Sequence, residues 1–183
     1  YRKKGSIDST QRLPQMRRLG NSDLQTTSVA MGCWPIAGIT SIDVNESASL
    51  ATLRAAFDAG VTHFDTAYTY GFDGESERMI ARALGDVRDQ ILIASKCGLH
   101  WEHGERARDA RPETVHRRCE ESLRRLQTDR IDLYYLHAPD PNVPLAETAG
   151  AFRELLDSGR VAAVGVSNLR TVTEFEQFHS ACP

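Results

Sequence analysis

The sequence lacks the features that mark several classes of protein. Its four cysteines include no close pair of the kind that binds zinc or exchanges a disulfide, so we expect free thiols. Its 22 basic and 25 acidic residues leave a net charge of −3, which gives no long-range attraction to nucleic acid or anionic lipid. No apolar run approaches the roughly 20 residues of a membrane span, and residues 1–15 hold no stretch resembling a signal peptide. We therefore expect a cytoplasmic protein with no nucleic-acid or membrane partner.

The remaining composition is that of one globular domain. The chain has 183 residues, of which 40% are hydrophobic, and this is enough to bury a core. Residues 1–15 are polar and aperiodic, so we interpret them as an extension or a tag-like segment. The folded domain is expected to span residues 16–183.

Short apolar runs recur about every thirty residues and are typical of strands buried on both faces. Segments with helical periodicity lie between them, and they begin near a proline or a capping box such as Asp43–Glu46 or Thr171–Glu174. Strand and helix thus alternate five times, which predicts βα units and a parallel sheet. The predicted strands are 28–34, 61–65, 91–95, 131–136 and 161–166.

Two α/β architectures fit this alternation. A doubly wound sheet is complete with five strands, whereas a (β/α)8 barrel of the TIM type needs eight strands and about 250 residues. A dinucleotide-binding doubly wound sheet carries a G-x-G-x-x-G turn after its first strand, and residues 31–35, MGCWP, lack it. Polar residues instead follow four successive strands, as in a barrel. We therefore predict a partial (β/α)8 barrel with about five βα units. These polar residues are Asp65, Lys96, His137 and the pair Ser167 and Asn168.

Three of the polar side chains suit proton transfer. Lys96 directly follows an apolar strand, where its ammonium needs a carboxylate partner, and Asp65 on the neighbouring strand can supply one. An ammonium beside the phenol of Tyr70 would lower the tyrosine pKa from about 10 and make it a usable general acid. Taken singly, Asp65 fits a turn cap equally well and Lys96 fits an exposed position.

The other two strand ends suit the binding of polar ligand groups. A neutral imidazole at His137 could donate a hydrogen bond to a substrate oxygen. Ser167 and Asn168 offer a hydroxyl and an amide that suit a flat carboxamide, although Ser-Asn is also a good helix-start pair. Each signal alone is weak, and their combination on successive strands indicates an active site.

These segments resemble the aldo-keto reductase family. The stretch GVTHFDTAYTYG is similar to the family's second strand with its Asp and Tyr, and ILIASK to its third strand with its lysine. LYYLHAPDP and VAAVGVSN are similar to its fourth and fifth strands with their His and Ser-Asn. MRRLGNSDLQTTSVAMGCW resembles the N-terminal β-hairpin that closes the bottom of the barrel. The resemblance covers residues 16–183.

The resemblance implies an enzyme that transfers a hydride from a nicotinamide cofactor, usually NADPH and with NADH as the alternative, to a small aldehyde or ketone. It implies that Tyr70 protonates the alkoxide, that Lys96 lowers the pKa of Tyr70, and that Asp65 holds Lys96 and approaches the cofactor. It implies that His137 orients the carbonyl.

The resemblance also implies a binding pocket. Ser167 and Asn168 would bind the carboxamide of the cofactor. Cys33 and Trp34 would line the cofactor and substrate end of the pocket. Trp101 would form a wall on the substrate side, within a long loop from Cys97 to Arg111 that we expect to act as a mobile lid.

Residues 16–183 lack the family's strands six to eight. A half-barrel exposes unpaired strand edges and apolar faces, which favour assembly. We weigh three explanations: the chain is part of a longer enzyme, it pairs with a second chain or copy, or it is a natural truncation.

Two other functions compete with reduction. The family includes potassium-channel β subunits that bind NADPH as regulatory partners, so a non-catalytic binding role is an alternative. A zinc hydrolase using His100, Glu102 and His103 is a second one, because two histidines and a carboxylate can hold the ion. The reductase interpretation requires no metal.

Overall fold

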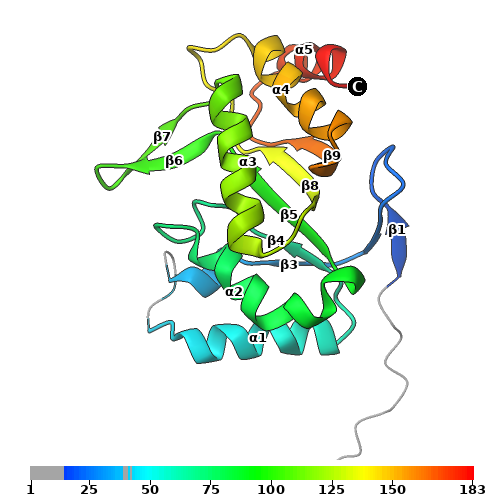
Figure 1. Ribbon diagram of the computed structural model, residues 1–183, viewed down its shortest axis with the longest axis vertical. Helices are drawn as coiled ribbons and strands as arrows, with labels where there is room; N and C mark the ends of the chain where they lie inside the picture. Colours follow the sequence, from blue (N-terminus) through cyan, green and yellow to red (C-terminus); the bar gives the residue numbers. More distant parts are fainter. Residues whose placement is uncertain (1–14, 39–40, 42) are drawn as a thin grey trace, which may run out of the picture.

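A computed structural model describes residues 15–38, 41 and 43–183, and a five-stranded parallel sheet forms its centre (Figure 1). The strands neighbour one another in chain order, β3-β4-β5-β8-β9. This order differs from that of a doubly wound sheet, in which the strand sequence reverses, and it confirms the predicted partial barrel. The strands are β3 (Ala30–Gly32), β4 (His63–Asp65), β5 (Leu92–Cys97), β8 (Ile131–Leu136) and β9 (Val161–Val166).

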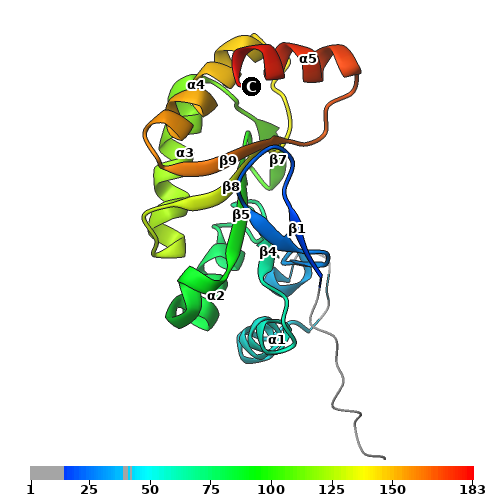
Figure 2. The ribbon, with the colours of Figure 1, turned by 90° about the vertical axis from the view of Figure 1, so that its right-hand side faces the viewer.

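Five α-helices follow the strands as predicted, and α2, α3 and α4 lie along one side of the sheet (Figure 2). Each helix packs against the next one in the chain. The 3-10 helices η1 (Pro35–Ala37) and η2 (Gly85–Gln90) follow β3 and α2. The α-helices are α1 (Glu46–Asp58), α2 (Glu75–Leu84), α3 (Pro112–Leu126), α4 (Leu145–Asp157) and α5 (Val172–Ala181).

Two predicted helix starts have different outcomes. The side chain of Thr171 accepts a hydrogen bond of 3.1 Å from the Glu174 N–H, which confirms the cap of α5. The predicted cap at Asp43 is wrong, because the side chain of Asn45 accepts a 2.8 Å bond from the Ala48 N–H at the start of α1. Both residues suit an N-cap, and only the geometry decides between them.

The side chains of β5 show how the sheet divides two cores. Successive residues of a strand point to opposite faces, so Leu92, Ala94 and Lys96 share one face. Leu92 and Ala94 belong to a small interior cluster with Leu133 and Ala163. The opposite face, with Ile93 and Cys97, packs into the larger core under the helices. Lys96 therefore lies on the interior face of the barrel.

An N-terminal hairpin of β1 (Met16–Arg18) and β2 (Gln25–Thr27) covers this interior, as predicted. Leu19 and Leu24, from its turn, pack on the interior cluster. The Thr26 hydroxyl lies 2.9 Å from Nδ1 of His63 on β4, and Thr27 Oγ1 accepts a 3.3 Å bond from the Thr62 N–H. In Figure 2 the hairpin lies on the side of the sheet opposite to α3.

The two outer strands of the sheet are less buried than the sequence predicts. Among the described residues, β3 pairs only with β4 and β9 pairs only with β8. No residue of β3 is fully buried, and β9 is half-buried from Val164 to Val166. The expectation of burial on both faces is therefore wrong for these strands, since each has one edge without a neighbour.

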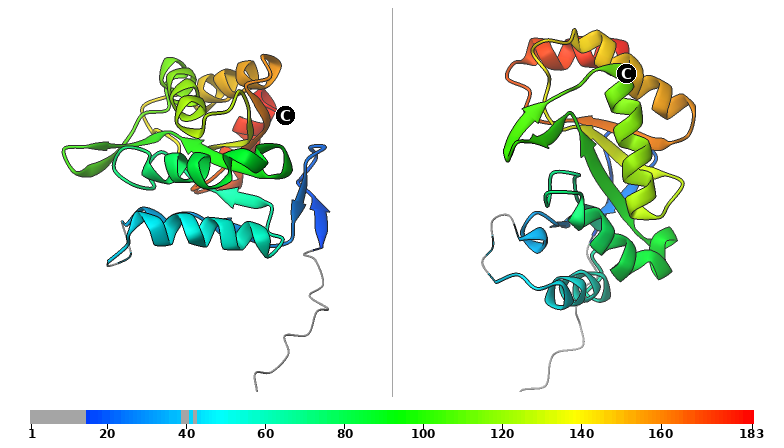
Figure 3. Two further views of the ribbon diagram at one scale, coloured as in Figure 1. Left: turned by 60° about the horizontal axis from the view of Figure 1, so that its bottom comes forward. Right: turned by 60° about the vertical axis from the view of Figure 1, so that its left-hand side comes forward.

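The segment predicted as a long loop from Cys97 to Arg111 contains an antiparallel hairpin. Its strands are β6 (Leu99–Glu102) and β7 (Glu105–Arg108), and it projects beyond the central sheet (Figures 1 and 3). The turn residues His103 and Gly104 have φ of 51° and 84°. Two successive positive φ values are the signature of the tight turns that join hairpin strands.

Candidate active site

An ion pair between a buried lysine and a half-buried aspartate lies at the carboxyl ends of β4 and β5. Lys96 Nζ donates to Asp65 Oδ1 at 2.5 Å and to the Thr66 carbonyl at 2.8 Å, and the Lys96 side chain is 7% exposed. The sequence predicts Lys96 just past its strand, whereas it lies within β5 and pairs with Tyr135. Burial lowers the pKa of Lys96, and the charge of Asp65 opposes that shift. The predicted partnership of Asp65 and Lys96 is confirmed by this geometry.

The phenol of Tyr70 contacts the same carboxylate. Its hydroxyl donates to Asp65 Oδ1 at 3.4 Å, and Lys96 Nζ lies 4.7 Å from the centroid of its ring. Burial raises the pKa of Tyr70, and the charge of Asp65 and this hydrogen bond raise it further. The predicted lowering of the Tyr70 pKa is therefore wrong in this arrangement, because the phenol is partly buried and its hydroxyl bonds to the carboxylate and not to the ammonium.

The imidazole of His137 lies beside Tyr70 at the end of β8. The two ring centroids are 5.9 Å apart in an edge-on arrangement. The backbone N–H of His137 donates to the Cys97 carbonyl at 2.7 Å, which ties the start of the following loop to β5. Burial lowers the pKa of His137 to about 4, and the charges of Lys96 and Arg106 add to the shift. The imidazole is neutral at pH 7, as predicted.

Ser167 and Asn168 follow β9 at the same edge of the sheet. The amide nitrogen of Asn168 donates to the His137 carbonyl at 2.8 Å and to Ser167 Oγ at 3.1 Å. Asn168 adopts a φ of 55°, which asparagine tolerates better than most residues. The pair therefore joins the ends of β8 and β9 and presents a hydroxyl and an amide within hydrogen-bonding distance of each other.

This geometry gathers an aspartate, a tyrosine, a lysine and a histidine at the ends of three neighbouring strands. Residues 28–183 match the aldo/keto reductase family. The chain belongs to the aldo/keto reductase family. Membership confirms the predicted family and the barrel type of the fold.

This aldo/keto reductase chain resembles proteins of about twice its length. Aldo-keto reductase YhdN of Bacillus subtilis is 38% identical over 167 residues, which are 90% of this chain and 50% of that protein. Glycerol dehydrogenase AKR11B4 from Gluconobacter oxydans has a structure with a TM-score of 0.83 and 34% identity, over 92% of this chain and 52% of that one. An aldo/keto reductase from Klebsiella pneumoniae, solved with NADP and acetate, has a TM-score of 0.69 and 33% identity, over 84% of this chain and 49% of that one.

Aromatic side chains surround Tyr70 in this aldo/keto reductase chain. The ring of Trp34 packs edge-on against Tyr70, with centroids 4.9 Å apart. Trp101 Nε1 donates to the Gly71 carbonyl at 2.7 Å, which fastens the β6–β7 hairpin to the loop that carries Tyr70.

Cys33, predicted on the pocket wall, has no exposed surface and lies in the larger core, so its thiol lines no open surface.

The structure brings two side chains to the site that sequence reasoning missed. The hydroxyl of Thr69 lies 3.5 Å from His137 Nδ1 and is buried. The guanidinium of Arg106 lies 4.4 Å from the ring centroid of Trp34 and 5.2 Å from that of Trp101. The His103-Gly104 turn is the signal that could have placed Arg106 opposite Trp101 on a hairpin.

Within the described residues, no group of three or more His, Cys, Asp and Glu side chains is arranged to hold a metal ion. His100 and Glu102 lie on β6, and His103 lies in its turn. The structure therefore gives the zinc hydrolase alternative no support.

Over the described part of the chain, no helix is long and apolar enough to cross a membrane. All four cysteines are buried free thiols, as predicted.

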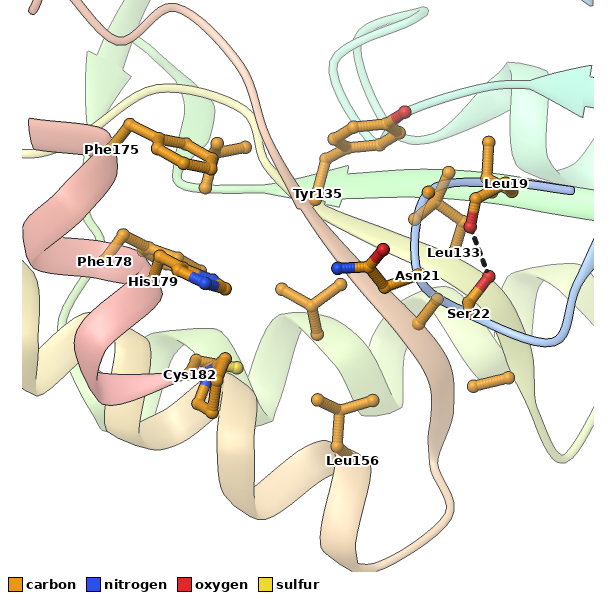
Figure 4. Close-up of a pocket in the computed structure, with 17 residues that line it drawn as sticks. Leu19, Asn21, Ser22, Leu133, Tyr135, Leu156, Phe175, Phe178, His179 and Cys182 are labelled. Atoms are coloured by element: carbon orange, nitrogen blue, oxygen red, sulfur yellow. Dashed lines mark hydrogen bonds between the residues drawn. The ribbon is translucent and has the colours of Figure 1, made fainter. Parts of the chain in front are cut away.

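A hollow lies beside β9, away from Tyr70. Its volume is about 490 Å³, and none of Asp65, Tyr70, Lys96 and His137 lines it. Figure 4 shows the α5 side chains on one side of the hollow and the hairpin turn of the barrel bottom on the other. Its wall includes Tyr135 and Leu133 of β8, Phe175 and Phe178 of α5, and Leu19 and Asn21 of the turn.

Proposed function

We propose that the protein containing this chain is an NAD(P)H-dependent oxidoreductase that reduces an aldehyde or a ketone to an alcohol. The observation that carries this proposal is the single carboxylate oxygen of Asp65, which accepts a hydrogen bond from both Lys96 at 2.5 Å and Tyr70 at 3.4 Å. An ion pair, a phenol and a neutral imidazole at the mouth of a barrel are the groups that acid-assisted carbonyl reduction requires.

The residues at the end of β9 fit a nicotinamide carboxamide. Ser167 Oγ and the Asn168 amide lie 3.1 Å apart, and together they can donate to a carbonyl oxygen and accept from an amide N–H. The cofactor supplies the hydride when it is bound. NADPH is the proposed form, with NADH possible, since the Klebsiella relative was solved with NADP.

Tyr70 would supply the proton that completes the alcohol. The phenol holds its proton at neutral pH, as any tyrosine does and as a general acid must before the reaction. Its raised pKa makes it a weaker acid, so the proton transfer depends on stabilisation of the phenolate. The phenolate that remains is stabilised by the Lys96 ammonium, 4.7 Å from the ring centroid. Asp65 would hold Lys96 in place. The neutral His137 would donate its imidazole N–H to the substrate oxygen and orient it toward Tyr70.

The test compares NADPH oxidation by the complete protein and by its Tyr70→Phe variant, with 4-nitrobenzaldehyde as substrate. We expect turnover in the wild type and a loss of about 100-fold or more in the variant. A protein that binds NADPH without turning over the aldehyde would be a binding or regulatory subunit. Equal turnover in both proteins would remove Tyr70 from the mechanism.

We also propose that three further strands close the barrel beside β9 and β3. Three observations support this: the open edge of each strand, the hollow of about 490 Å³ beside β9, and the length of the relatives, of which this chain covers about half. The strands could come from additional chain or from a second copy. Intact mass and light scattering of the native protein distinguish these sources. A monomer of this length alone with full activity would contradict the proposal.

A further inference from the structure

Arg106 has a defined position at the mouth of the proposed site. It lies on β7 directly opposite Trp101 of β6, and its guanidinium stacks 4.4 Å from the ring centroid of Trp34. Trp34 in turn contacts the Tyr70 ring. Burial raises the pKa of Tyr70 and the charge of Arg106 opposes that shift, whereas at His137 burial lowers the pKa and the charge of Arg106 adds to the shift. Two indoles therefore hold this cation beside the phenol and the imidazole.

The position of Arg106 differs from that of most arginines in the structure. No carboxylate of the described residues lies within 4.0 Å of its guanidinium, and no side-chain hydrogen bond from it occurs there. Arg108, two residues further on the same strand, instead donates to the Pro139 carbonyl at 3.2 Å. A guanidinium that is stacked on aromatic rings and keeps its donors open suits planar, bidentate recognition of an anion.

We propose that Arg106 binds the carboxylate of an oxo-acid substrate, so that the protein prefers carbonyl compounds carrying an anionic group over neutral ones. This inference rests on the proposed function and names its substrate class. The Trp34 ring contacts both Arg106 and Tyr70, so one indole lies between the proposed carboxylate site and the proposed general acid. A benzaldehyde with a carboxylate in the para position separates its two groups by one aromatic ring and is therefore the test substrate.

The experiment uses the complete protein and two substrates of nearly equal shape, 4-carboxybenzaldehyde and methyl 4-formylbenzoate. The measured quantity is the ratio of their kcat/KM values, acid over ester. In the wild type this ratio should exceed one, and Arg106→Met should lower it about tenfold, through KM of the acid. Arg106→Lys should retain part of the ratio, because it keeps the charge and loses the planar fork.

Arg108→Met is the matched control, since it removes the same charge from the same strand. An equal fall of the ratio in Arg108→Met would mean a general field effect and would overturn the assignment to Arg106. A ratio unchanged by Arg106→Met would also overturn it. So would an Arg106→Met variant in which the KM for NADPH rises and the KM for 4-carboxybenzaldehyde does not. Turnover of neither substrate by the wild type would mean that the proposed function itself has failed. Turnover of the ester that depends on Tyr70, with an unchanged ratio, would refute only the carboxylate site.

Discussion

Replacing Lys96 with methionine tests whether the ion pair supports proton transfer. Methionine keeps an unbranched apolar side chain and removes an ammonium that lies 4.7 Å from the centroid of the Tyr70 ring. Lys96 Nζ and the Tyr70 hydroxyl both contact Asp65 Oδ1, at 2.5 and 3.4 Å. Two unit charges about 6 Å apart, the most that this geometry allows, interact by about 3 kcal/mol at an effective dielectric constant of about 20. A phenolate at Tyr70 would lose this stabilisation. We therefore expect kcat for aldehyde reduction to fall by roughly 100- to 1,000-fold.

The assay is steady-state NADPH oxidation with the complete protein, in a cycle with Tyr70→Phe. Because the ammonium acts through the phenol, Lys96→Met should cost little further activity in the Tyr70→Phe background. Removing one partner of a fully buried ion pair costs about 3–5 kcal/mol, and the loss of folding stability in urea unfolding should be smaller here because Asp65 is partly exposed. An equal loss of kcat in both backgrounds would refute the reasoning, because Lys96 would then act independently of Tyr70.

Two further predictions concern stability. The pKa of His137 is about 4 in the folded protein and about 6.5 when unfolded, so the unfolded state binds more protons between these values. Stability should therefore fall by up to about 3 kcal/mol as the pH drops from 6.5 to 4, and His137→Gln should weaken this dependence in urea titrations. A β-carbon at Gly165 would overlap the Tyr135 ring, so Gly165→Ala should cost about 1–3 kcal/mol. Gly150→Ala, in open space on α4, should be neutral or stabilising, and equal losses in both variants would contradict the packing argument.

The elements with strong apolar patterns were predicted most closely. The strands 131–136 and 161–166 match β8 and β9 residue for residue, because their apolar runs end at polar or turn residues. The β6–β7 hairpin was missed because none of its strand residues is buried and its apolar alternation, in LHWE, spans only one short strand. The clearest sequence signal for the hairpin is its two-residue turn. The turn is His-Gly, which is less common at this position than Asn-Gly.

The contact between Asp65 and Lys96 could be predicted, and the electrostatics of Tyr70 could not. Strand order and the alternation along β4 and β5 place Asp65 and Lys96 on one face, so their contact follows from sequence spacing. The direction of the Tyr70 pKa shift depends first on how far the phenol is buried and then on which neighbour its hydroxyl contacts, and the sequence specifies neither. Arg106 was missed for a related reason, since its place beside Trp34 depends on the path of the hairpin.

The central claim is that the Asp65 carboxylate holds both the ammonium of Lys96 and the proton of Tyr70. The most direct measurement is the Tyr70 pKa from NMR of protein labelled at the tyrosine ring, with Tyr70→Phe to assign the signal. The account predicts a pKa above the ordinary value of about 10 in the wild type. It predicts a clear decrease in Asp65→Asn, where the charge of Lys96 is no longer opposed. A wild-type pKa at or below 10, or no change in Asp65→Asn, would contradict it.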